Sequence, residues 1–375
     1  MRLAQIIDSL STGGAQALLI TLAETLREGA LDLTVISLQD DADQPVGRAL
    51  AALGVRVLAC PGRGLLAPRR LWRLRQLMAR ERFDVLHAHL TYAIVLGWLA
   101  TRGSATAFVA SLHNVRPDHP RWHPLYWLET VALRQARRVV AVGQVVAAAH
   151  QARLGGRPLE VIVNAVQPGA GLSEAEAQAL RAEVAGDAAR PLLLAVGRLT
   201  PQKAYPDLLR AYQELRHTHP QAVLAIAGTG HSEAEVRSLI ERWGLGGAVR
   251  LLGRRPDVPR LLAASDVYVL ASHWEGLPVA VLEAMAAGRP VVATAVGDVP
   301  QVLAPGLGVL VPAHRPDLLA AALRGVLDDP AGRQALGQAA RQHVLQHYSP
   351  AKWAGQLLAV YTAALDAPVP SGSRA

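Results

Sequence analysis

Cysteine and long apolar segments are both scarce in this chain of 375 residues. The single cysteine, Cys60, excludes an internal disulfide bond and fits a reducing compartment. The longest apolar segment, residues 92–112, is interrupted by an arginine, a glycine and a serine at 102–104. We interpret it as a helix followed by a strand and not as a membrane span. The chain also reaches Asp8 without the long apolar core of a secretory signal, so we expect a cytoplasmic protein.

Lysine is missing from the first 170 residues, although this half is strongly basic. It holds 19 arginines and 12 acidic residues, a net charge of +7, whereas the rest of the chain holds 19 basic and 18 acidic residues, a net charge of +1. This asymmetry suggests an anionic partner for the first half, either nucleic acid or a phospholipid surface. No nucleic-acid-binding motif accompanies the charge, which disfavours nucleic acid.

Residues 69–82 concentrate this charge in a predicted amphipathic helix. Leucines and a methionine lie on one side, arginines lie mostly on the other, and Trp72 adds an amphipathic aromatic side chain. Helices of this kind occur on membrane surfaces. A second basic and aromatic cluster follows at residues 121–127. The pattern leaves two interpretations open: docking on an anionic membrane, and a solvated face whose arginines only keep the domain soluble.

Short apolar strands alternate with helices in two series along the chain. The first series runs from residues 2–7 to 161–163, and the second runs from 192–196 to 291–294. Such alternation predicts two doubly wound parallel sheets of the α/β class, with ligands at the carboxyl ends of the strands. The stretch 164–169, marked by Gly and Pro, is the predicted hinge.

These limits give a predicted domain organisation. We expect an N-terminal domain over residues 1–165, a C-terminal domain over 166–349, a final amphipathic helix at about 350–366, and a disordered tail at 367–375. A chain of this length is too long for one ordinary core, which agrees with two domains.

Residues 272–288 predict a loop that turns into a short apolar helix. Pro278 suits the first helical position, and Gly288 suits the residue just past the last turn. Glu275 and Glu283 interrupt the apolar pattern, and a buried, unpaired carboxylate is costly, so each is expected to face a polar ligand or a partner. The free N–H groups at the helix start favour an anion such as phosphate.

Further polar residues and glycines fall at predicted strand ends of both halves. Arg supplies a bidentate fork and Lys a point charge for a diphosphate, glycines allow close approach of the backbone, and a carboxylate accepts ribose hydroxyls. A histidine at the end of a strand is a further candidate, best at His113 and weaker at His87 and His89. In the second half, the set predicts a nucleotide-diphosphate site without a Walker loop or a carboxylate–metal motif; its members are Gly197, Arg198, Lys203, Gly228, Gly230, Glu275 and Glu283. In the first half, the glycine pair Gly13 and Gly14 after the first strand also lets a ligand approach the backbone closely.

In order and spacing, these motifs resemble those of the retaining glycosyltransferases of family 4, which have the GT-B fold of two Rossmann-like domains facing a cleft. The resemblance covers nearly the whole chain and is densest at about 192–310. It implies a hexosyltransferase-type enzyme that uses a UDP- or GDP-type sugar donor, a glycan or lipid-linked acceptor, and no cofactor or metal. It also implies synthesis of cell-surface polysaccharide or glycolipid at the inner face of the plasma membrane. The final helix is expected to pack back on the N-terminal, acceptor-binding domain.

The resemblance also implies a role for each residue. Arg198 and Lys203 hold the diphosphate and stabilise the leaving group, and Glu283 binds the ribose. Glu275, with the backbone of Gly276 and Leu277, addresses the donor sugar, which the histidine matching His113 also contacts. Gly13 and Gly14 lie near the phosphates or the acceptor.

Two positions depart from the family pattern. Ala204 stands where Gly or Asn usually follows the lysine, and the hinge sequence at 164–167 lacks the usual acid. Retention of configuration normally suggests a double displacement, whereas the family favours front-face attack, and the sequence leaves both open. Two other functions also stay open: a non-catalytic nucleotide-sugar-binding subunit, and a sugar-nucleotide epimerase on the same fold.

Overall fold

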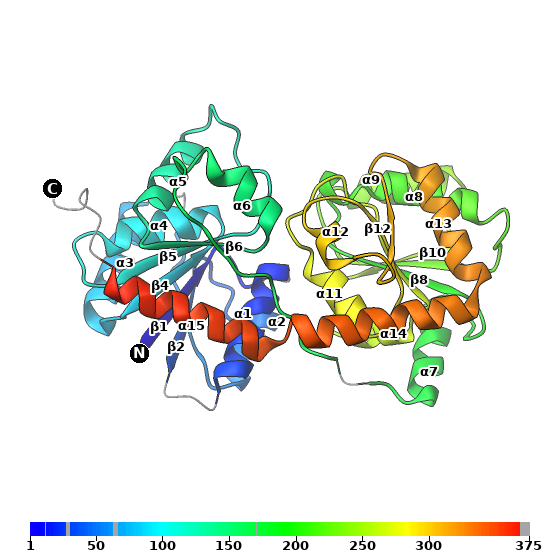
Figure 1. The fold of residues 1–375 in the computed structure, drawn as a ribbon, viewed down its shortest axis with the longest axis horizontal. Helices are drawn as coiled ribbons and strands as arrows, with labels where there is room; N and C mark the ends of the chain where they lie inside the picture. The colour runs from blue at the N-terminus through cyan, green and yellow to red at the C-terminus, as the bar shows by residue number, and fades with distance from the viewer. Residues whose placement is uncertain (12, 28–30, 63–66, 170, 368–375) are drawn as a thin grey trace. The chain divides into compact units, whose positions relative to one another are not determined.

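The computed structural model describes residues 1–11, 13–27, 31–62, 67–169 and 171–367, which fold as two compact units. The first unit contains residues 1–165 together with the C-terminal segment from Pro350, and the second contains residues 166–349. Each unit has one parallel sheet with helices packed on it (Figure 1). The predicted fold class, α/β with two doubly wound sheets, is confirmed.

The sheet of the first unit has seven strands in the order β3-β2-β1-β4-β5-β6-β7, and every pair is parallel. The central strands are buried and mostly apolar because helices cover both faces. The strand order reverses between β1 and β4, which is where open α/β sheets bind ligands. The strands are β1 (Arg2–Ile7), β2 (Asp32–Ser37), β3 (Arg56–Ala59), β4 (Val85–His89), β5 (Ala107–Leu112), β6 (Arg138–Ala141) and β7 (Glu160–Val161).

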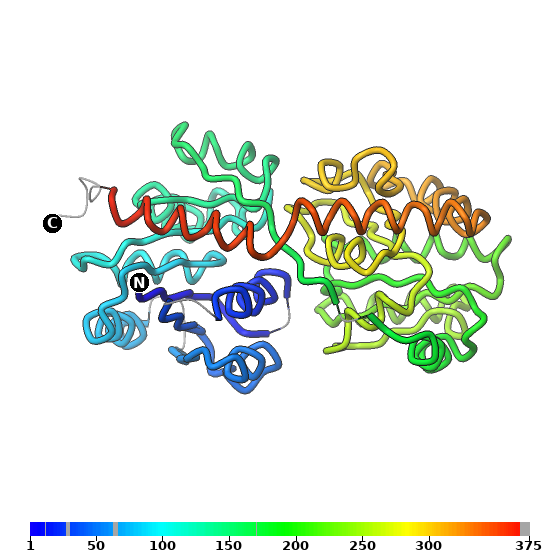
Figure 2. The backbone as a smooth tube through the Cα atoms, turned by 60° about the horizontal axis from the view of Figure 1, so that its bottom comes forward, coloured from blue at the N-terminus to red at the C-terminus, as the bar shows by residue number. Residues whose placement is uncertain are grey.

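The last helix of the chain belongs to the first unit. It packs against α1, β4 and β5, with Trp353, Leu357 and Tyr361 buried, and both views show it running along this unit (Figures 1 and 2). Its end is held by the Arg137 guanidinium, which donates to the carbonyl of Ala364. The helices of this unit are α1 (Gly14–Leu26), α2 (Pro45–Ala52), α3 (Pro68–Glu81), α4 (Thr91–Thr101), α5 (Pro124–Gln135), α6 (Gln144–Gln151) and α15 (Pro350–Asp366).

The sheet of the second unit has six parallel strands in the order β10-β9-β8-β11-β12-β13. Its order reverses between β8 and β11, where Leu193 lies opposite Val267. The strands are β8 (Leu192–Val196), β9 (Val223–Ala227), β10 (Val249–Gly253), β11 (Val267–Leu270), β12 (Val291–Thr294) and β13 (Val309–Val311).

The helices of the second unit cover both faces of its sheet (Figure 1). A single turn of 3₁₀ helix, Pro201–Lys203, precedes the first helix after β8. The α-helices are α7 (Glu174–Ala185), α8 (Tyr205–Leu215), α9 (Glu233–Arg242), α10 (Val258–Ala264), α11 (Val279–Ala286), α12 (Val299–Val302), α13 (Pro316–Asp328) and α14 (Pro330–His347).

Three local predictions are wrong. Pro278 precedes the first turn of α11 and does not belong to it, because its ψ of 118° is extended. Arg70 is buried and not solvated: its guanidinium donates to the carbonyls of Leu38 and Gly62. The acidic cluster of Asp40, Asp41 and Asp43 predicts a solvated loop, but Asp41 is buried, and it accepts hydrogen bonds from the backbone N–H of Leu10 and from the Ser37 hydroxyl.

Two further points concern the ends of the predictions. The helix expected to reach Glu28 is described as far as Leu26, and Glu28 lies outside the described residues. Of the predicted disordered tail, residues 368–375 also lie outside them. Within the described ranges, no helix is long and apolar enough to cross a membrane.

Candidate functional site

Two loops at the reversal point of the second sheet carry most of the candidate residues. One follows β8 and contains Arg198 and Lys203, and the other follows the adjacent strand β11 and contains Glu275. Backbone and side-chain bonds join them: the N–H of His273 donates to the Gln202 carbonyl at 2.9 Å, and the Gln202 amide donates to the carbonyl of Trp274 at 3.0 Å. The pairing of β8 with β11 therefore determines which residues meet here.

Glu275 is buried and fully hydrogen-bonded within this pair of loops. One carboxylate oxygen lies 2.6 Å from the Lys203 ammonium and 2.7 Å from the Ser272 hydroxyl, and the other accepts from the Gln202 amide at 3.1 Å. The side chains of Lys203 and Glu275 are 15% and 7% exposed. The sequence assigned Lys203 to the diphosphate and Glu275 to the sugar, and the structure pairs the two charges with each other.

Arg198 is a cation of this site whose charge is not paired within the described residues. Its side chain is exposed, and no acceptor or carboxylate of the described residues pairs with it. The backbone around it is held firmly, since the N–H groups of Gly197 and Leu199 donate to the carbonyls of Ala227 and Thr229, each at 3.0 Å. A guanidinium presented in this way from the end of a strand suits a phosphate group.

Gly228 and Gly230 let the loop after β9 pack directly on the loop that carries Arg198. Gly228 has a φ of +145°, and a Cβ there would lie 2.0 Å from the carbonyl oxygen of Gly197. A Cβ on Gly230 would lie 2.2 Å from the carbonyl oxygen of Leu199. The sequence predicted that these glycines let a ligand approach the backbone closely. In the structure, the close approach is between two loops of the protein.

Gly276 and Leu277 are held by the loop after β12. The N–H of Asp298 donates to the Gly276 carbonyl at 2.9 Å. Gly297, at a φ of +56°, has no space for a side chain, because a Cβ would meet the Glu275 carbonyl oxygen at 2.3 Å. The side chain of Leu277 is buried. This backbone is therefore fixed beside Glu275.

Glu283, on α11, has a carboxylate without a partner among the described residues. It is half-buried, and burial raises its pKa to about 7. The neighbouring Tyr268 is fully buried, and its hydroxyl also lacks a protein partner in the described part of the chain. Unpaired polar groups of this kind are unfavourable unless a ligand or water satisfies them. Glu283 thus meets the expectation for an acid that faces a polar ligand.

In the first unit, Gly13 and Gly14 begin α1. Gly13 is the capping residue, whose carbonyl accepts from the N–H of Ala17, and Gly14 is exposed in the first turn. The sequence missed Asp8, which directly follows β1 and accepts hydrogen bonds from the N–H groups of Tyr92 and Ala93. Burial raises the pKa of Asp8 to about 7. An acid directly after the first strand was the available signal.

His113 is the end of a buried chain of hydrogen bonds in the first unit. Its Nε2 lies 3.0 Å from Nδ1 of His89, whose Nε2 lies 2.7 Å from the amide oxygen of Gln5. The Gln5 amide nitrogen donates to the Tyr361 hydroxyl at 3.0 Å, and that hydroxyl lies 2.8 Å from Nδ1 of His87. Two residues missed from the sequence, Gln5 and Tyr361, thus connect three histidines that it named.

The hydrogen bonds between His113, His89 and Gln5 all donate in the same direction. Burial lowers the pKa of His113 to about 4 and that of His87 to about 3, and it places the pKa of His89 well below its ordinary value. All three rings are therefore neutral near pH 7, with one donor and one acceptor nitrogen each. Because the Gln5 oxygen accepts from His89, His89 accepts from His113. The remaining nitrogen of His113, Nδ1, is then an acceptor.

A cavity of about 20 Å³ lies beside this network, and Gln5, His87, His89 and His113 are among its mostly apolar lining residues. Its volume is enough for about one water molecule. It is therefore too small for a sugar.

Both units of the chain match known protein families. Residues 176–343 match the family described as glycosyl transferases group 1, and residues 12–169 match glycosyltransferase family 4. The D-inositol 3-phosphate glycosyltransferase of Kineococcus radiotolerans is 31% identical over 88% of this chain and 86% of its own length. The GDP-mannose-dependent monoacylated alpha-(1-6)-phosphatidylinositol monomannoside mannosyltransferase of Corynebacterium glutamicum is 33% identical over 42% of this chain and 44% of its own length.

A solved structure shares the fold over nearly the whole chain. It is that of Anabaena HepE in complex with UDP-glucose, which has a TM-score of 0.87 and 23% identity, and the match covers 96% of this chain and 99% of that one. The family matches extend over both units, and a relative that is 31% identical aligns with most of the chain. The chain therefore belongs to family 4 of the glycosyltransferases, with the GT-B fold.

Proposed function

We propose that this chain is a retaining, metal-independent glycosyltransferase that moves a hexose from a UDP- or GDP-sugar to a glycan or lipid-linked acceptor. The observation that carries the proposal is which charged side chains of the site in the second unit are paired and which are not. Arg198 and Glu283 have no partner among the described residues, whereas the charges of Lys203 and Glu275 are already paired. A nucleotide diphosphate supplies what both lack: anionic oxygens for Arg198 and ribose hydroxyls for Glu283.

Charge stabilisation is the main catalytic contribution in this proposal. Negative charge grows on the diphosphate as the sugar leaves, and Arg198 meets it from the end of β8. Lys203 adds to the field of the site and is oriented by Glu275 at 2.6 Å. Because a cation of the protein performs this role, activity is expected to persist in EDTA without added Mg²⁺ or Mn²⁺.

The hydrogen bonding of Glu275 favours front-face attack over double displacement. A carboxylate nucleophile needs a free oxygen, and both oxygens of Glu275 are bound by Lys203, Ser272 and Gln202. In front-face attack, the leaving diphosphate takes the proton of the acceptor hydroxyl. His113 contributes an acceptor nitrogen for a sugar hydroxyl, and it does not act as a general acid near pH 7 because its lowered pKa keeps the ring neutral.

The acceptor is proposed to be lipid-linked because of exposed tryptophans on the first unit. Trp72, Trp122 and Trp127 are 61%, 80% and 55% exposed. Trp72 lies on α3 and Trp127 on α5, and both helices pack against α4. Tryptophan beside arginine is the composition of membrane-surface anchors, which favours peripheral docking at the cytoplasmic side of the plasma membrane.

One experiment tests the activity. The chain is incubated with a panel of UDP-, GDP- and ADP-sugars and with glycan and lipid-linked acceptors, and release of the nucleoside diphosphate is measured. We expect release with one nucleotide class, dependent on acceptor, and retention of the anomeric configuration in the product. Binding without release would favour a non-catalytic nucleotide-sugar-binding subunit, and an altered sugar without transfer would favour an epimerase.

A further inference from the structure

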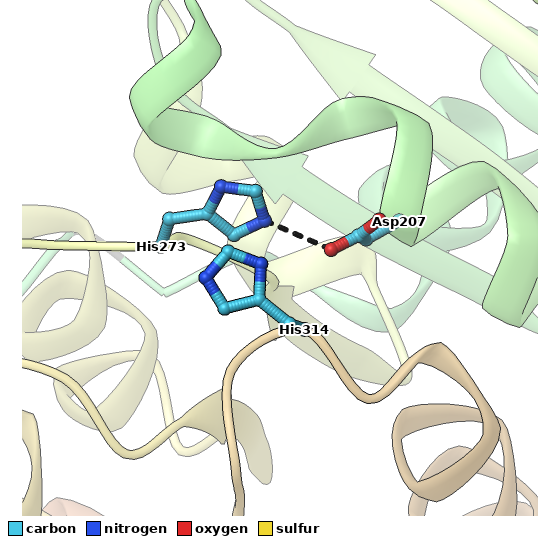
Figure 3. A group of neighbouring side chains, drawn as sticks. All are labelled: Asp207, His273 and His314. Atoms are coloured by element: carbon cyan, nitrogen blue, oxygen red, sulfur yellow. Dashed lines mark hydrogen bonds and ion pairs between the residues drawn. The ribbon is translucent and has the colours of Figure 1, made fainter.

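Three side chains of the kind that bind metals converge in the second unit. Asp207 lies in the first turn of α8, His273 lies in the loop after β11, and His314 lies in the loop after β13. One ligand atom from each, a carboxylate oxygen and two imidazole nitrogens, lies within 4.8 Å of the others (Figure 3). None of the three has a role in the function proposed above.

Two features of this cluster suit a bound cation. Oδ2 of Asp207 lies 2.8 Å from Nε2 of His273, so a carboxylate oxygen and a ring nitrogen are already adjacent, as two ligands of one ion would be. The His314 ring lies over that of His273, with centroids 3.8 Å apart. In the part of the chain that the structure describes, no hydrogen-bond acceptor or donor engages the exposed His314 ring. Its nitrogens are therefore available.

The backbone of His314 is strained. Its φ is +60°, a left-handed conformation that is unfavourable for a residue with a side chain and occurs more often at functional sites. Arg315, the next residue, has its charge balanced by Asp317. The positive φ and this pairing leave the imidazole of His314, and not a positive charge, beside Asp207 and His273.

We propose that Asp207, His273 and His314 bind a first-row transition-metal ion, for which Zn²⁺ is the probe. Two imidazoles and one carboxylate form a common zinc ligand set, with water as the fourth ligand. Nitrogen donors disfavour Mg²⁺ and Ca²⁺, which prefer oxygen. Metal–ligand bonds of about 2.0–2.2 Å require the exposed His314 side chain to rotate inward. Coordination through Nε2 of His273 leaves the proton of that ring on Nδ1.

This site is structural and not catalytic, and it does not depend on the proposed function. The ion links three segments: the start of α8, the loop after β11 and the loop after β13. Glu275 lies in the same loop as His273, and the His273 N–H donates to Gln202 in the loop after β8, so both loops of the candidate site are connected to the ion. Zn²⁺ is thus expected to stiffen the candidate site without entering it.

The test is calorimetric titration of the chelator-treated full chain with ZnCl₂, together with its thermal unfolding. Wild type is expected to bind Zn²⁺ with a rise in Tm that millimolar Mg²⁺ does not reproduce. His314→Gly should weaken this binding at least tenfold and abolish the Tm rise. Glycine accepts the positive φ, so this variant should fold.

A matched control is His219→Gly. His219 also pairs with an acid, Asp328, at 3.2 Å, but no third ligand joins that pair among the described residues. This variant should bind Zn²⁺ as wild type does. The stacked pair His343 and His347 on α14 is the main competing site. If His314→Gly binds Zn²⁺ like wild type, or if His347→Gln removes the tight site instead, the proposal is overturned.

Discussion

At the residue scale, Glu283 combines a cost in stability with its proposed role in binding the ribose. Its pKa is raised from an ordinary 4.5 to about 7 by burial. Between these values the unfolded chain has lost the proton that the folded protein keeps, so its contribution to stability falls as the pH rises from about 4.5 to 7. A ribose that donates hydrogen bonds to the ionised carboxylate is bound better above that window.

Glu283→Gln should therefore separate stability from binding. Without nucleotide, its Tm should exceed that of wild type by an amount that grows between about pH 5 and pH 8, because the buried charge is removed. Its affinity for UDP or GDP should fall by about tenfold or more at pH 8, since a hydrogen bond to a charged group contributes roughly 1.5–3 kcal/mol. Calorimetry and thermal scans over this pH range measure both.

The exposed Glu241 is the control for this prediction: Glu241→Gln should change neither quantity. A Glu283→Gln protein with wild-type nucleotide affinity at pH 8 would remove Glu283 from the ribose site.

Arg198 and Lys203 should differ when each is replaced by alanine. Arg198 is exposed and unpaired within the described chain, so Arg198→Ala should lower turnover with little change in Tm. Lys203→Ala leaves the carboxylate of Glu275 buried without its cation, which costs roughly 3–5 kcal/mol, so it should lower Tm as well as turnover. Steady-state kinetics and thermal unfolding of both variants give the comparison.

The double variant Lys203→Met/Glu275→Gln checks the cause. It should recover part of the Tm lost in Lys203→Ala, because no unpaired charge stays buried, while remaining slow. Wild-type turnover in Arg198→Ala would exclude Arg198 from the leaving group.

At the scale of elements, the sequence predicted strands better than contacts. The bounds of β8, β11 and β12 agree with the prediction because buried runs of Val, Leu and Ala end at residues that favour turns. The prediction placed β7 at 161–163, whereas it lies at Glu160–Val161. An edge strand this short does not show a periodic pattern from which its bounds could be predicted. The prediction that Arg70 is solvated was wrong because a helical pattern shows on which face of the helix a side chain lies but not which hydrogen-bond acceptors it meets.

The site was predictable as a set of residues but not as a set of pairs. Lys203 and Glu275 were found from their motifs, yet their ion pair arises from the adjacency of β8 and β11 in the sheet. The hydrogen bond between Gln5 and Tyr361 joins the first strand to the last helix, and no local sequence pattern predicts it. Long-range pairing of this kind is fixed by topology.

The helix α15 is linked to the sheet through the hydroxyl of Tyr361, which leads to a prediction for Tyr361→Phe. The change removes an acceptor from Gln5 and a donor from His87, leaving both buried without it, at a cost of roughly 1–3 kcal/mol. Tm should fall, and the ring of His113 should lose its single tautomer. Thermal unfolding and ¹⁵N chemical shifts of the imidazoles report these effects.

Tyr92→Phe is the matched control, since Tyr92 is 37% exposed and lies outside the network. An unchanged tautomer of His113 in Tyr361→Phe would show that α15 does not position this histidine.

At the scale of the whole molecule, the basic charge belongs to the first unit, where the exposed tryptophans also lie. Several arginines near an anionic surface contribute about 1 kcal/mol each, enough for reversible binding. Co-sedimentation at low salt should show binding to anionic vesicles and little to neutral ones. Arg69→Ser/Arg73→Ser should weaken it, and Arg70 is left unchanged because it is buried.

The charge-matched control is Arg242→Ser/Arg324→Ser, which removes two exposed arginines from the second unit and should bind as wild type does. If wild type shows no preference for anionic vesicles at low salt, a soluble acceptor becomes the better hypothesis.

The return of α15 to the first unit has a consequence for synthesis of the protein on the ribosome. The second unit is continuous in sequence, but the first is divided, with the whole of the second between its parts. At about 5–20 residues per second, roughly 10–40 s pass between translation of Ala165 and of Pro350. The buried face later covered by Trp353 and Tyr361 stays open to solvent and chaperones throughout that interval. The second domain to emerge is thus the first able to finish folding.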